Sequence, residues 1–279
     1  MEPFSLQVLI DTALAEDIAF HDLTAQATID GMQQGKATII AKVGGILSGC
    51  DVAKQVFTTM DEMITQTWLH QDGDAIQQGE TICQLDGNMR MLLSAERTAL
   101  NFMQHLSGIA TATSLFVQAL QDTDCVIADT RKTTPGLRHL EKEAVLHGGG
   151  KNHRMDLASG MLIKENHILA AGSITDAVAQ CHKLSPDTWI EVECETLEEV
   201  IEAVHVCPDI ILLDNMNTDT VKEARKLVPE SMLLEASGNI TLDNAKSYAQ
   251  TGINRIAVGA ITHSAPCLDL SMRVSSVPS

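Results

Sequence analysis

The second half of the chain alternates short apolar runs with amphipathic stretches. The runs are rich in Val, Ile and Leu and lie at residues 125–129, 160–164, 189–194, 209–215, 232–237 and 255–259. Between them, helical periodicity covers residues near 137–147, 173–184, 196–206, 218–227 and 241–250. Strands that alternate with helices of this length predict right-handed βαβ units and a parallel sheet. About six parallel strands favour an irregular, possibly open α/β barrel, and a doubly wound open sheet is the alternative because periodicity does not separate the two.

Three of the predicted helices carry start signals. Ser173 precedes the helical pattern ITDAVAQ, and Thr241 precedes LDNAKSYAQ. Thr196 is followed three residues later by Glu199, which is the spacing of a capping box. These positions predict where the helices begin.

The first half has a different pattern. A helix is predicted over residues 5–17, and residues 35–49 have strand composition interrupted by glycines. A second helix is predicted near 51–61, residues 71–85 resemble turns around short strands, and a long helical pattern covers 94–121. This mixture predicts an α+β domain over residues 1–115, followed by an α/β barrel domain over 116–266.

Composition narrows the classes of partner. The chain has 279 residues and a formal net charge of −18, which argues against nucleic acid or an anionic membrane as its general partner. No apolar run reaches the roughly 18 residues that span a bilayer, and the first residues do not resemble a signal peptide. Seven cysteines are scattered without a CxxC pair, so we expect reduced, buried thiols in a cytoplasmic protein rather than a structural zinc site.

One segment departs from this acidic background. Residues 131–164 contain seven of the chain's 19 Lys and Arg residues and three acidic residues. A charge run of this kind is most often a solvated helix face. Here TTPG, HGGGKNH and ASG interrupt the run, so the cations cannot all lie on one helix. The segment therefore predicts a local anion-binding cluster.

The predicted strands end in polar or glycine-rich groups. In an α/β barrel, the reacting groups gather at the carboxyl ends of the strands. The residues at these ends are Thr130, Arg131, Lys132, Lys164, Glu193, Asp214, Ser237, Gly238, Asn239, Gly259 and Ala260. A single residue of this kind at a strand end is a simple polar cap as often as it is a functional residue. Because all six strands end in this way, the pattern predicts a site. Glu191 shares a strand face with Glu193, which lies nearer the carboxyl end.

The charges indicate the ligand. Arg131, Lys132, Arg154 and Lys164 would bind several anionic groups, with arginine forks matching carboxylate or phosphate. Loops after the last barrel strands commonly hold a phosphate. Glu193 and Asp214 would repel such a ligand unless Mg²⁺ lay between them. A sugar phosphate with a Mg²⁺-bound diphosphate, together with a carboxylated co-substrate, fits these groups.

The same residues carry a resemblance to a known family. The segment DTRKTTPGLRHLEKEAVLHGGGKNHRMDLASGMLIKENHI closely resembles the signature region of the quinolinate phosphoribosyltransferases of NAD biosynthesis. IEVECETLEE, ILLDNMN, LEASGNIT and AVGAITHS resemble the later motifs in order, and EDIAFHDLTA and LLSAERTALNFMQHLSGIAT match in the first half. The resemblance covers nearly the whole chain. It implies transfer of a phosphoribosyl group from phosphoribosyl diphosphate to quinolinate, with decarboxylation to nicotinate mononucleotide, diphosphate and CO₂.

The resemblance also implies an architecture and an assembly. The C-terminal residues 267–279 should return to the first domain, through residues 269–274. The protein should be a cytoplasmic homodimer, or a hexamer. Arg97 should reach the neighbour's site across the interface.

The resemblance assigns roles to individual residues. Arg131, Arg154 and Lys164 should hold the quinolinate carboxylates, with His153 alongside and Arg97 completing the pocket. Lys132 should face phosphoribosyl diphosphate, and Glu193 and Asp214 should serve Mg²⁺ and the ribose hydroxyls. Lys132, Lys164, Glu193 and Asp214 are the expected catalytic residues. The 5′-phosphate should lie among Ser237, Gly238, Asn239, Val258, Gly259 and Ala260, with His263 and Thr130 also at the site.

Three positions depart from the family pattern. His21 stands where a glycine is usual, and Asp156 and Ser159 stand where Gly and Asp are more typical. Asp156 adds a negative charge two residues from Arg154, which could weaken the binding of anions. Every position expected to contact the ligand is nevertheless present.

Three other functions fit parts of the pattern. A related pyrophosphorylase-like protein associated with molybdenum transport would use another acceptor, although LIKENHI argues against it. An aldolase barrel could form a Schiff base on Lys164. A non-enzymatic barrel could keep the pocket without turnover.

Overall fold

The computed structural model describes residues 5–19 and 21–276, and the chain forms two compact units. The first unit comprises Met1–Ala112, Thr134–Gly149 and Ala265–Ser279, and the second comprises Thr113–Thr133 and Gly150–Ser264. Segment 134–149, which contains helix α5 (Arg138–His147), thus groups with the N-terminal residues rather than with the sheet that follows it in the chain. The long helix α4 (Met89–Ala119) has residues in both units.

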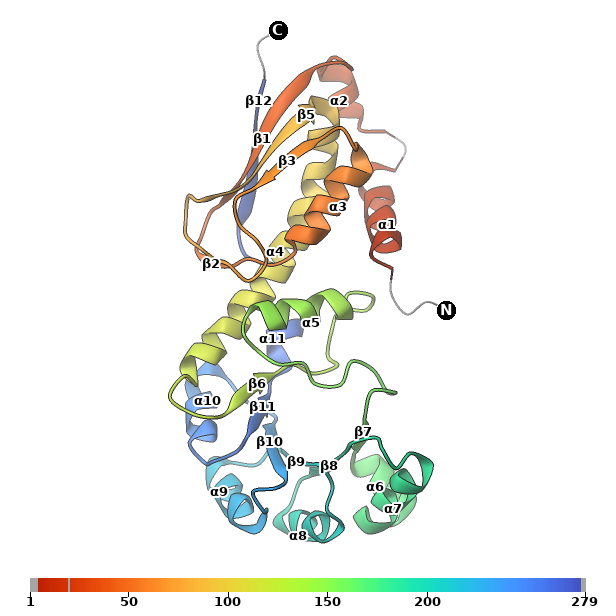
Figure 1. Cartoon of the computed structure of the whole chain (residues 1–279), viewed down its shortest axis with the longest axis vertical. Helices are drawn as coiled ribbons and strands as arrows, with labels where there is room; N and C mark the ends of the chain where they lie inside the picture. Colours follow the sequence, from red (N-terminus) through yellow and green to blue (C-terminus); the bar gives the residue numbers. More distant parts are fainter. Residues whose placement is uncertain (1–4, 20, 277–279) are drawn as a thin grey trace. The chain divides into compact units, whose positions relative to one another are not determined.

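The first unit is built on an antiparallel sheet. Its strands, in spatial order, are β12 (Leu270–Ser276), β1 (Gln34–Ala41), β5 (Thr81–Asn88) and β3 (Thr65–Trp68). Buried and exposed positions alternate along much of β1, as expected for a strand with one face in the core. The other elements are α1 (Leu6–Ile18), α2 (Leu23–Thr28), α3 (Cys50–Met60) and the short pair β2 (Gly45–Ile46) and β4 (Ala75–Ile76). Figure 1 shows α3 and α4 beside the sheet.

The C-terminal strand β12 belongs to the sheet of the first unit. Strand β12 pairs antiparallel with β1, with Leu270 opposite Ala41 and Ser275 opposite Lys36. Met272, on β12, is buried beside Ile39 in this register. The sheet of the first unit is therefore completed by residues from the end of the chain.

The second unit contains a parallel sheet of six strands. These are β6 (Val126–Ala128), β7 (Met161–Ile163), β8 (Ile190–Cys194), β9 (Ile210–Asp214), β10 (Leu233–Ser237) and β11 (Arg255–Ala257). Their spatial order is β6-β11-β10-β9-β8-β7. From β7 to β11 each strand lies beside its successor in the chain, so the winding does not reverse as it does in a doubly wound sheet. With β6 and β7 at its two edges, the sheet has the order of an open barrel, which confirms the predicted class.

Helices connect these strands in sequence. They are α6 (Glu165–Ala171), α7 (Ile174–Leu184), α8 (Leu197–Val206), α9 (Thr218–Leu227) and α10 (Leu242–Ala249). The short helix α11 (Ala260–His263) follows the last strand, β11. Neighbours from α6 to α10 contact one another, and Figure 1 shows them as a curved row along the strands. The five helices predicted between the strands all form.

The predicted start signals operate as caps. The Ser173 hydroxyl accepts a hydrogen bond from the backbone N–H of Asp176 at 3.0 Å. The Thr196 hydroxyl accepts from Glu199 N–H at 3.2 Å, and the Glu199 carboxylate accepts from Thr196 N–H at 3.1 Å. These bonds satisfy backbone donors that a helix start leaves unpaired.

The cysteines are all free thiols, but not all are buried. Cys50, Cys83, Cys125 and Cys194 are buried, whereas Cys207 and Cys267 are exposed. Cys207 lies at the C-terminal cap of α8 in the left-handed region, at φ 52°. The expectation of buried thiols is therefore wrong for these two residues. Cys207 is exposed because the apolar run AVHVC ends in a helix cap at the surface rather than in a strand.

Candidate active site

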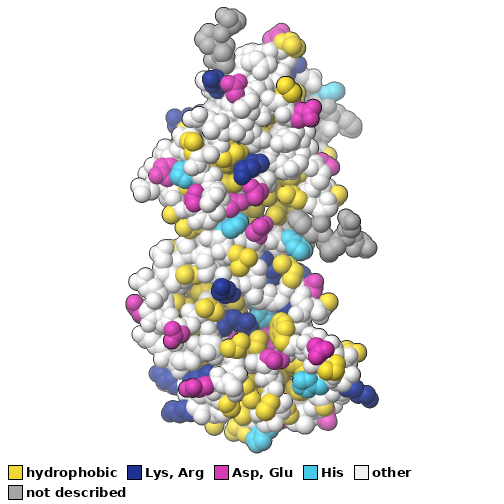
Figure 2. Space-filling model, in the orientation of Figure 1, with side chains coloured by type: hydrophobic (Ala, Val, Ile, Leu, Met, Phe, Trp, Pro, Cys, Tyr) yellow, Lys and Arg dark blue, Asp and Glu magenta, His cyan; other side chains and the backbone are white. Residues whose placement is uncertain are grey.

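A cavity of about 380 Å³ opens at the carboxyl ends of the strands of the second unit. Nine of the residues predicted from the sequence line it: Thr130, Arg131, Lys132, His153, Arg154, Lys164, Glu193, Asp214 and Ser237. The remaining lining residues are Leu162, Leu212, Glu235 and Ala257. Figure 2 shows Lys and Arg side chains interspersed with Asp and Glu side chains on the face of this unit that is in view.

Strand β6 and the segment after it bring two basic residues together. Lys151 forms a parallel bridge with Ala128, because its N–H donates to Ile127 and its carbonyl accepts from Asp129 N–H. The buried Asp129 carboxylate in turn accepts from His153 N–H at 2.8 Å. Segment 151–154 is thereby held along the end of β6, which places Arg154 near Arg131.

The two arginines are crowded and incompletely paired. Burial, and next the neighbouring Arg131 cation, lower the pKa of Arg154, while Glu191 and Asp156 act in the opposite direction. The Nε atoms of Arg131 and Arg154 are both buried and have no hydrogen-bond partner among the described residues. Buried donors are almost always satisfied. Two unsatisfied guanidinium donors in one cavity indicate that an anion completes the site.

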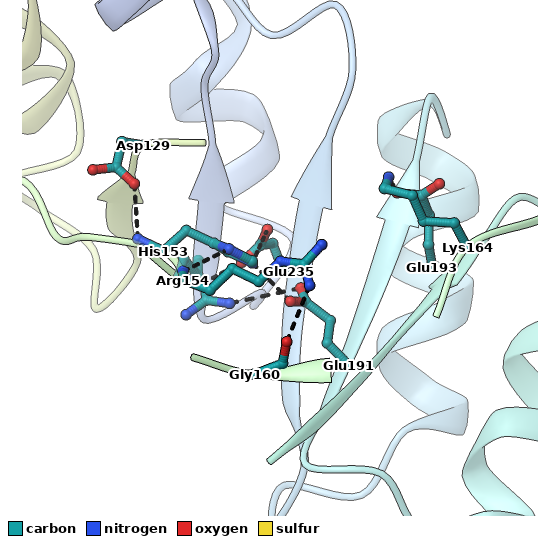
Figure 3. A network of polar contacts seen from close by, with 9 residues as sticks. Asp129, His153, Arg154, Gly160, Lys164, Glu191, Glu193 and Glu235 are labelled. Carbon is teal, nitrogen blue, oxygen red and sulfur yellow. Dashed lines mark hydrogen bonds and ion pairs between the residues drawn. The ribbon is translucent and has the colours of Figure 1, made fainter. Parts of the chain in front are cut away.

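Arg154 also bonds its own loop. Its Nη1 donates to the carbonyl of Gly160 at 3.0 Å, as Figure 3 shows. The two departures from the family pattern, Asp156 and Ser159, contact each other in this loop. The Asp156 carboxylate accepts from Ser159 N–H at 2.8 Å and from its hydroxyl at 2.6 Å. Much of the hydrogen-bonding capacity of Asp156 is therefore used within the turn.

Lys164 and Glu193 form a direct ion pair at the other side of the cavity. Lys164 follows β7, Glu193 lies on β8, and Figure 3 shows the two side chains adjacent to each other. The Glu193 side chain is 12% exposed and that of Lys164 is 45% exposed. A ligand carboxylate that binds Lys164 must therefore compete with Glu193.

The loops after β9 and β10 are locked together. Asn215 N–H donates to the Ser237 carbonyl at 2.9 Å, and the Asn239 side chain donates to Asn215 Oδ1 at 3.1 Å. Gly238 adopts φ 91°, and a Cβ there would lie 2.2 Å from Asn215 Oδ1. Glycine is required at this position by both conformation and space.

Lys132 lies beside the last loop. Its carbonyl accepts from the Thr262 hydroxyl at 2.8 Å, and a Cβ on Gly259 would lie 3.1 Å from the Lys132 side chain and 3.3 Å from His263. Val258 is buried and its N–H donates to the Ala128 carbonyl at 2.9 Å. Gly259, Ala260 and His263 therefore lie next to the cavity, although its lining does not include them.

Arg97 belongs to the first unit. It lies on α4 with a largely exposed side chain, and its Nη2 is 3.7 Å from Glu96 Oε1. Its predicted role in a neighbour's site remains a prediction.

Sequence reasoning missed Glu235. This residue lies inside the apolar run of β10, two positions before Ser237, and its side chain is fully buried at the cavity. An acidic residue in the middle of an otherwise apolar strand was the available signal. Its partner Arg255 opens β11 directly beside it in the sheet register.

A larger cavity of about 610 Å³ lies between β7, α6 and α7. Its lining is mainly apolar, and Arg154 and Leu162 border both cavities. The smaller cavity contains the converging ionisable groups, so it is the candidate active site.

Replacing Gly238 with alanine is expected to destabilise the second unit. The left-handed conformation costs about 1–2 kcal/mol for a residue with a Cβ, and the contact with Asn215 adds to it. Gly79→Ala is the matched control, since Gly79 has φ 88° and nothing within 4 Å of the added Cβ. Chemical denaturation should show a clearly larger loss for Gly238→Ala, and equal losses would contradict the locked-loop interpretation.

The chain matches two family models. Quinolinate phosphoribosyl transferase, N-terminal domain, matches residues 22–107, and the C-terminal domain of the same family matches residues 109–273. A probable nicotinate-nucleotide pyrophosphorylase (carboxylating) of Bacillus subtilis is 45% identical over 276 residues, which cover 99% of this chain and 95% of that protein. A nicotinate-nucleotide pyrophosphorylase (carboxylating) of Mycobacterium leprae is 39% identical over 94% of this chain and 95% of that protein.

Solved structures agree with these matches. The crystal structure of NadC from Streptococcus pyogenes is 39% identical, covers 100% of this chain and 99% of that one, and superposes with a TM-score of 0.95. In the part of the chain that the structure describes, no helix is both long enough and apolar enough to cross a membrane.

Proposed function

The chain belongs to the quinolinate phosphoribosyltransferase family, and we propose that the 380 Å³ cavity is where it joins quinolinate to phosphoribosyl diphosphate. The enzyme is a pentosyltransferase of NAD biosynthesis. Its reaction releases diphosphate and CO₂ and leaves nicotinate mononucleotide. We also propose which residues bind each of the two substrates.

One observation supports the assignment of quinolinate to the part of the cavity near Arg131 and Arg154. The Nε donors of Arg131 and Arg154 are buried at one cavity without partners in the described chain. A planar pyridine with two adjacent carboxylates offers acceptors that suit two guanidinium groups. Lys164, which is paired with Glu193, supplies a third cation at the opposite side. We assign the two carboxylates to these three residues.

His153 holds this arrangement in place rather than binding a carboxylate itself. Its Nδ1 accepts from the backbone N–H of Arg154 at 2.8 Å, so the ring proton lies on Nε2 and is donated to Glu191 at 2.7 Å. Both ring nitrogens are therefore occupied. This differs from the role expected from the family, in which His153 stands beside the carboxylates as a ligand.

Phosphoribosyl diphosphate is assigned to the remaining part of the cavity. Lys132 lies against Gly259, and the locked loop at Ser237–Asn239 presents its backbone next to Asp214. Backbone N–H groups without bulky side chains can approach a phosphate closely. Lys132 would balance the charge of the diphosphate as it leaves.

Mg²⁺ is proposed as the metal. Glu193 and Asp214 offer carboxylate oxygens on neighbouring strands β8 and β9, and this donor set fits an ion that binds through one or two carboxylates plus substrate phosphates. When bound, the ion would neutralise the diphosphate. The Asp214 carboxylate is oriented by the side-chain amide of Asn215, which donates to it at 2.7 Å.

Catalysis by the protein is then mainly positioning and electrostatics. The arginines and Lys164 fix the pyridine so that its nitrogen faces C1 of the ribose. Glu193 and Asp214 stabilise the positive charge that develops on the ribose. The alkylated ring then stabilises the electron pair left on the ring carbon when the adjacent carboxylate leaves as CO₂, and that carbon takes up a proton from water to give nicotinate mononucleotide. No covalent nucleophile is needed, and burial raises the pKa of Cys125 and Cys194 to about 12, so these thiols stay protonated.

We also propose a cytoplasmic homodimer. Arg97 has an exposed side chain, which is available to a second copy. The seven free thiols are compatible with a reducing compartment. Whether two or six copies assemble is a question for light scattering of the purified chain.

The function is tested by following quinolinate loss in the presence of phosphoribosyl diphosphate, with and without Mg²⁺. Quinolinate should be consumed with stoichiometric CO₂ release, and chelation of the metal should abolish turnover. Nicotinate as acceptor should give no product. Activity with nicotinate alone would overturn the substrate assignment, and quinolinate binding without CO₂ release would favour a non-catalytic role.

A further inference from the structure

A buried polar cluster forms part of the floor of the candidate active site. It consists of His153, Glu191 on β8, Glu235 on β10 and Arg255 on β11, and Figure 3 shows the three labelled members close together. The side chains of Glu191 and Glu235 are completely inaccessible to solvent. His153 and Glu235 both line the cavity.

We propose that Glu235 is a specificity-determining residue for the anionic substrate, which binds tightly only while Glu235 holds a proton and the cavity floor carries no uncompensated negative charge. This inference rests on the proposed function, because it takes quinolinate as the anion. The family resemblance and the sequence pattern assigned no role to Glu235, Glu191 or Arg255.

The charges of the cluster do not balance without a proton. Arg255 Nε donates to the Glu235 carboxylate, and Arg255 Nη2 lies 3.7 Å from Glu191 Oε1. One guanidinium thus serves two buried carboxylates. Burial of an unpaired charge is costly, so the excess negative charge is expected to be removed by protonation.

His153 does not supply this missing positive charge. A second ring proton would have to sit on Nδ1, which already accepts from the N–H of Arg154 at 2.8 Å. Two donors would then face each other. The proton therefore belongs to a carboxyl group, and Glu191 is the better anion because it accepts from His153 Nε2 at 2.7 Å.

Glu235 has the surroundings of a carboxyl group that keeps its proton. Its Oε1 is buried without a hydrogen-bond partner and lies 4.0 Å from His153 Nε2. Burial, and next the negative charge of Glu191, raise the pKa of Glu235 to about 7, while the Arg255 guanidinium acts in the opposite direction. The proton is therefore lost as the pH rises through about 7.

A metal ion is a poor alternative occupant of the cluster. Ligand atoms of His153, Glu191 and Glu235 lie within 4.8 Å of one another. However, the guanidinium of Arg255 already binds the Glu235 carboxylate and supplies the cation there. A divalent ion would have to displace it.

The groups that face Glu235 come from every neighbouring element. Glu191 faces it from β8, Arg255 from β11 and His153 from the segment after α5, while Leu212 of β9, opposite in register, has no ionisable group. At the start of β6, the Cys125 thiol stays protonated because burial raises its pKa to about 12. Arg154, beside His153, remains a cation at neutral pH. Glu235 is thus the group of this cluster whose charge is expected to change between pH 6 and 8.5.

The sign of the pH effect follows from these charges. Quinolinate has both carboxylates ionised from pH 6 upward. Below pH 7, Glu235 is neutral and does not repel the dianion. Above pH 7, the free enzyme must take up a proton before it binds, so the affinity should fall by about tenfold or more between pH 6 and 8.5.

Isothermal titration of quinolinate into the full chain tests this inference. We expect the wild type to take up about one proton per bound quinolinate at pH 8.5 and almost none at pH 6, measured from buffers of different ionisation enthalpy. Glu235→Gln should keep the pH 6 affinity and lose both the fall and the proton uptake. The amide is uncharged at every pH, and its oxygen can still accept from Arg255.

The matched control is Asp209→Asn. The Asp209 carboxylate accepts a hydrogen bond from Ile190 N–H at 2.7 Å, at the amino end of the same sheet. The substitution replaces a carboxylate with an amide, as Glu235→Gln does, but outside the cavity. This variant should keep the wild-type pH dependence. His263 is another ionisable group near the cavity, so a fall that survives in Glu235→Gln would come from a group other than Glu235 and would overturn the inference.

The possible outcomes distinguish failure of the role of Glu235 from failure of the proposed function. Quinolinate binding that is independent of pH, without proton uptake by the wild type, overturns the role of Glu235 alone. Failure to bind quinolinate at any pH overturns the proposed function as well. If Glu235→Gln does not fold, His263→Gln decides: proton uptake that persists in this variant supports Glu235, and loss of the uptake overturns the inference.

Discussion

Replacing Arg154 with alanine is expected to lower kcat/KM for quinolinate by about 30-fold to several-thousand-fold, a loss of roughly 2–5 kcal/mol. The guanidinium is half-buried, lies near Arg131 and has an unpartnered Nε at the cavity. Removing it leaves a substrate carboxylate without one of its three proposed cationic partners. Steady-state kinetics with quinolinate varied at saturating phosphoribosyl diphosphate measure the loss.

The fold should survive this change. The Arg154 side chain donates a hydrogen bond to the Gly160 carbonyl within its own loop, so its removal is expected to cost little packing. Arg225→Ala is the matched control, because Arg225 also donates to backbone carbonyls, those of Val228 and Pro229, but lies on α9 outside the cavity. The control should lower the thermal midpoint and keep kcat/KM near normal. Near-normal kinetics for Arg154→Ala would refute the site.

The parallel sheet could be predicted from sequence because its strands are buried on both faces. Such strands are continuous apolar runs, and the runs at 209–215 and 232–237 became β9 and β10 with small boundary shifts. Short helices could not be predicted in this way. Helices α2, α6 and α11 have six, seven and four residues, too few to establish a helical period.

Most of the site could be predicted for a different reason. The carboxyl ends of parallel strands meet at one edge, so a polar residue that ends a strand is placed by topology alone. Arg131, Lys164, Glu193 and Asp214 were found by this rule, and the cavity contains all four. The cation cluster indicated Arg154 and the resemblance added His153, and both residues lie on a loop that no strand pattern locates.

The buried cluster could not be predicted because it depends on register between strands. Glu235 lies opposite Arg255 on β11 and opposite Leu212 on β9, and neither pairing can be read from one strand. The family signature assigned a role to His153 from its place in the sequence. The contacts of its two ring nitrogens are known only from the structure. Sequence patterns locate side chains but do not identify which nitrogen carries a proton.

Replacing Lys164 with methionine is expected to lower kcat/KM for quinolinate by about 100-fold or more. The change removes a cation proposed to bind a substrate carboxylate and leaves Glu193 with no counter-charge from this residue, so a negative group then faces the incoming dianion. The double variant Lys164→Met/Glu193→Gln removes both charges. It should recover any lost thermal stability without recovering activity, because both residues are proposed to act on the substrates.

Two further measurements make this test specific. Lys246→Met removes a lysine that pairs with Asp122 at 3.1 Å on the surface of the same unit, and it should leave kcat/KM unchanged. Borohydride should trap no substrate adduct on the wild-type enzyme, since a Schiff-base lysine needs apolar or cationic surroundings and Lys164 instead contacts a carboxylate. Recovery of activity in the double variant would reduce Lys164 to a structural partner of Glu193. A trapped adduct on Lys164 would instead indicate a Schiff-base aldolase reaction rather than phosphoribosyl transfer.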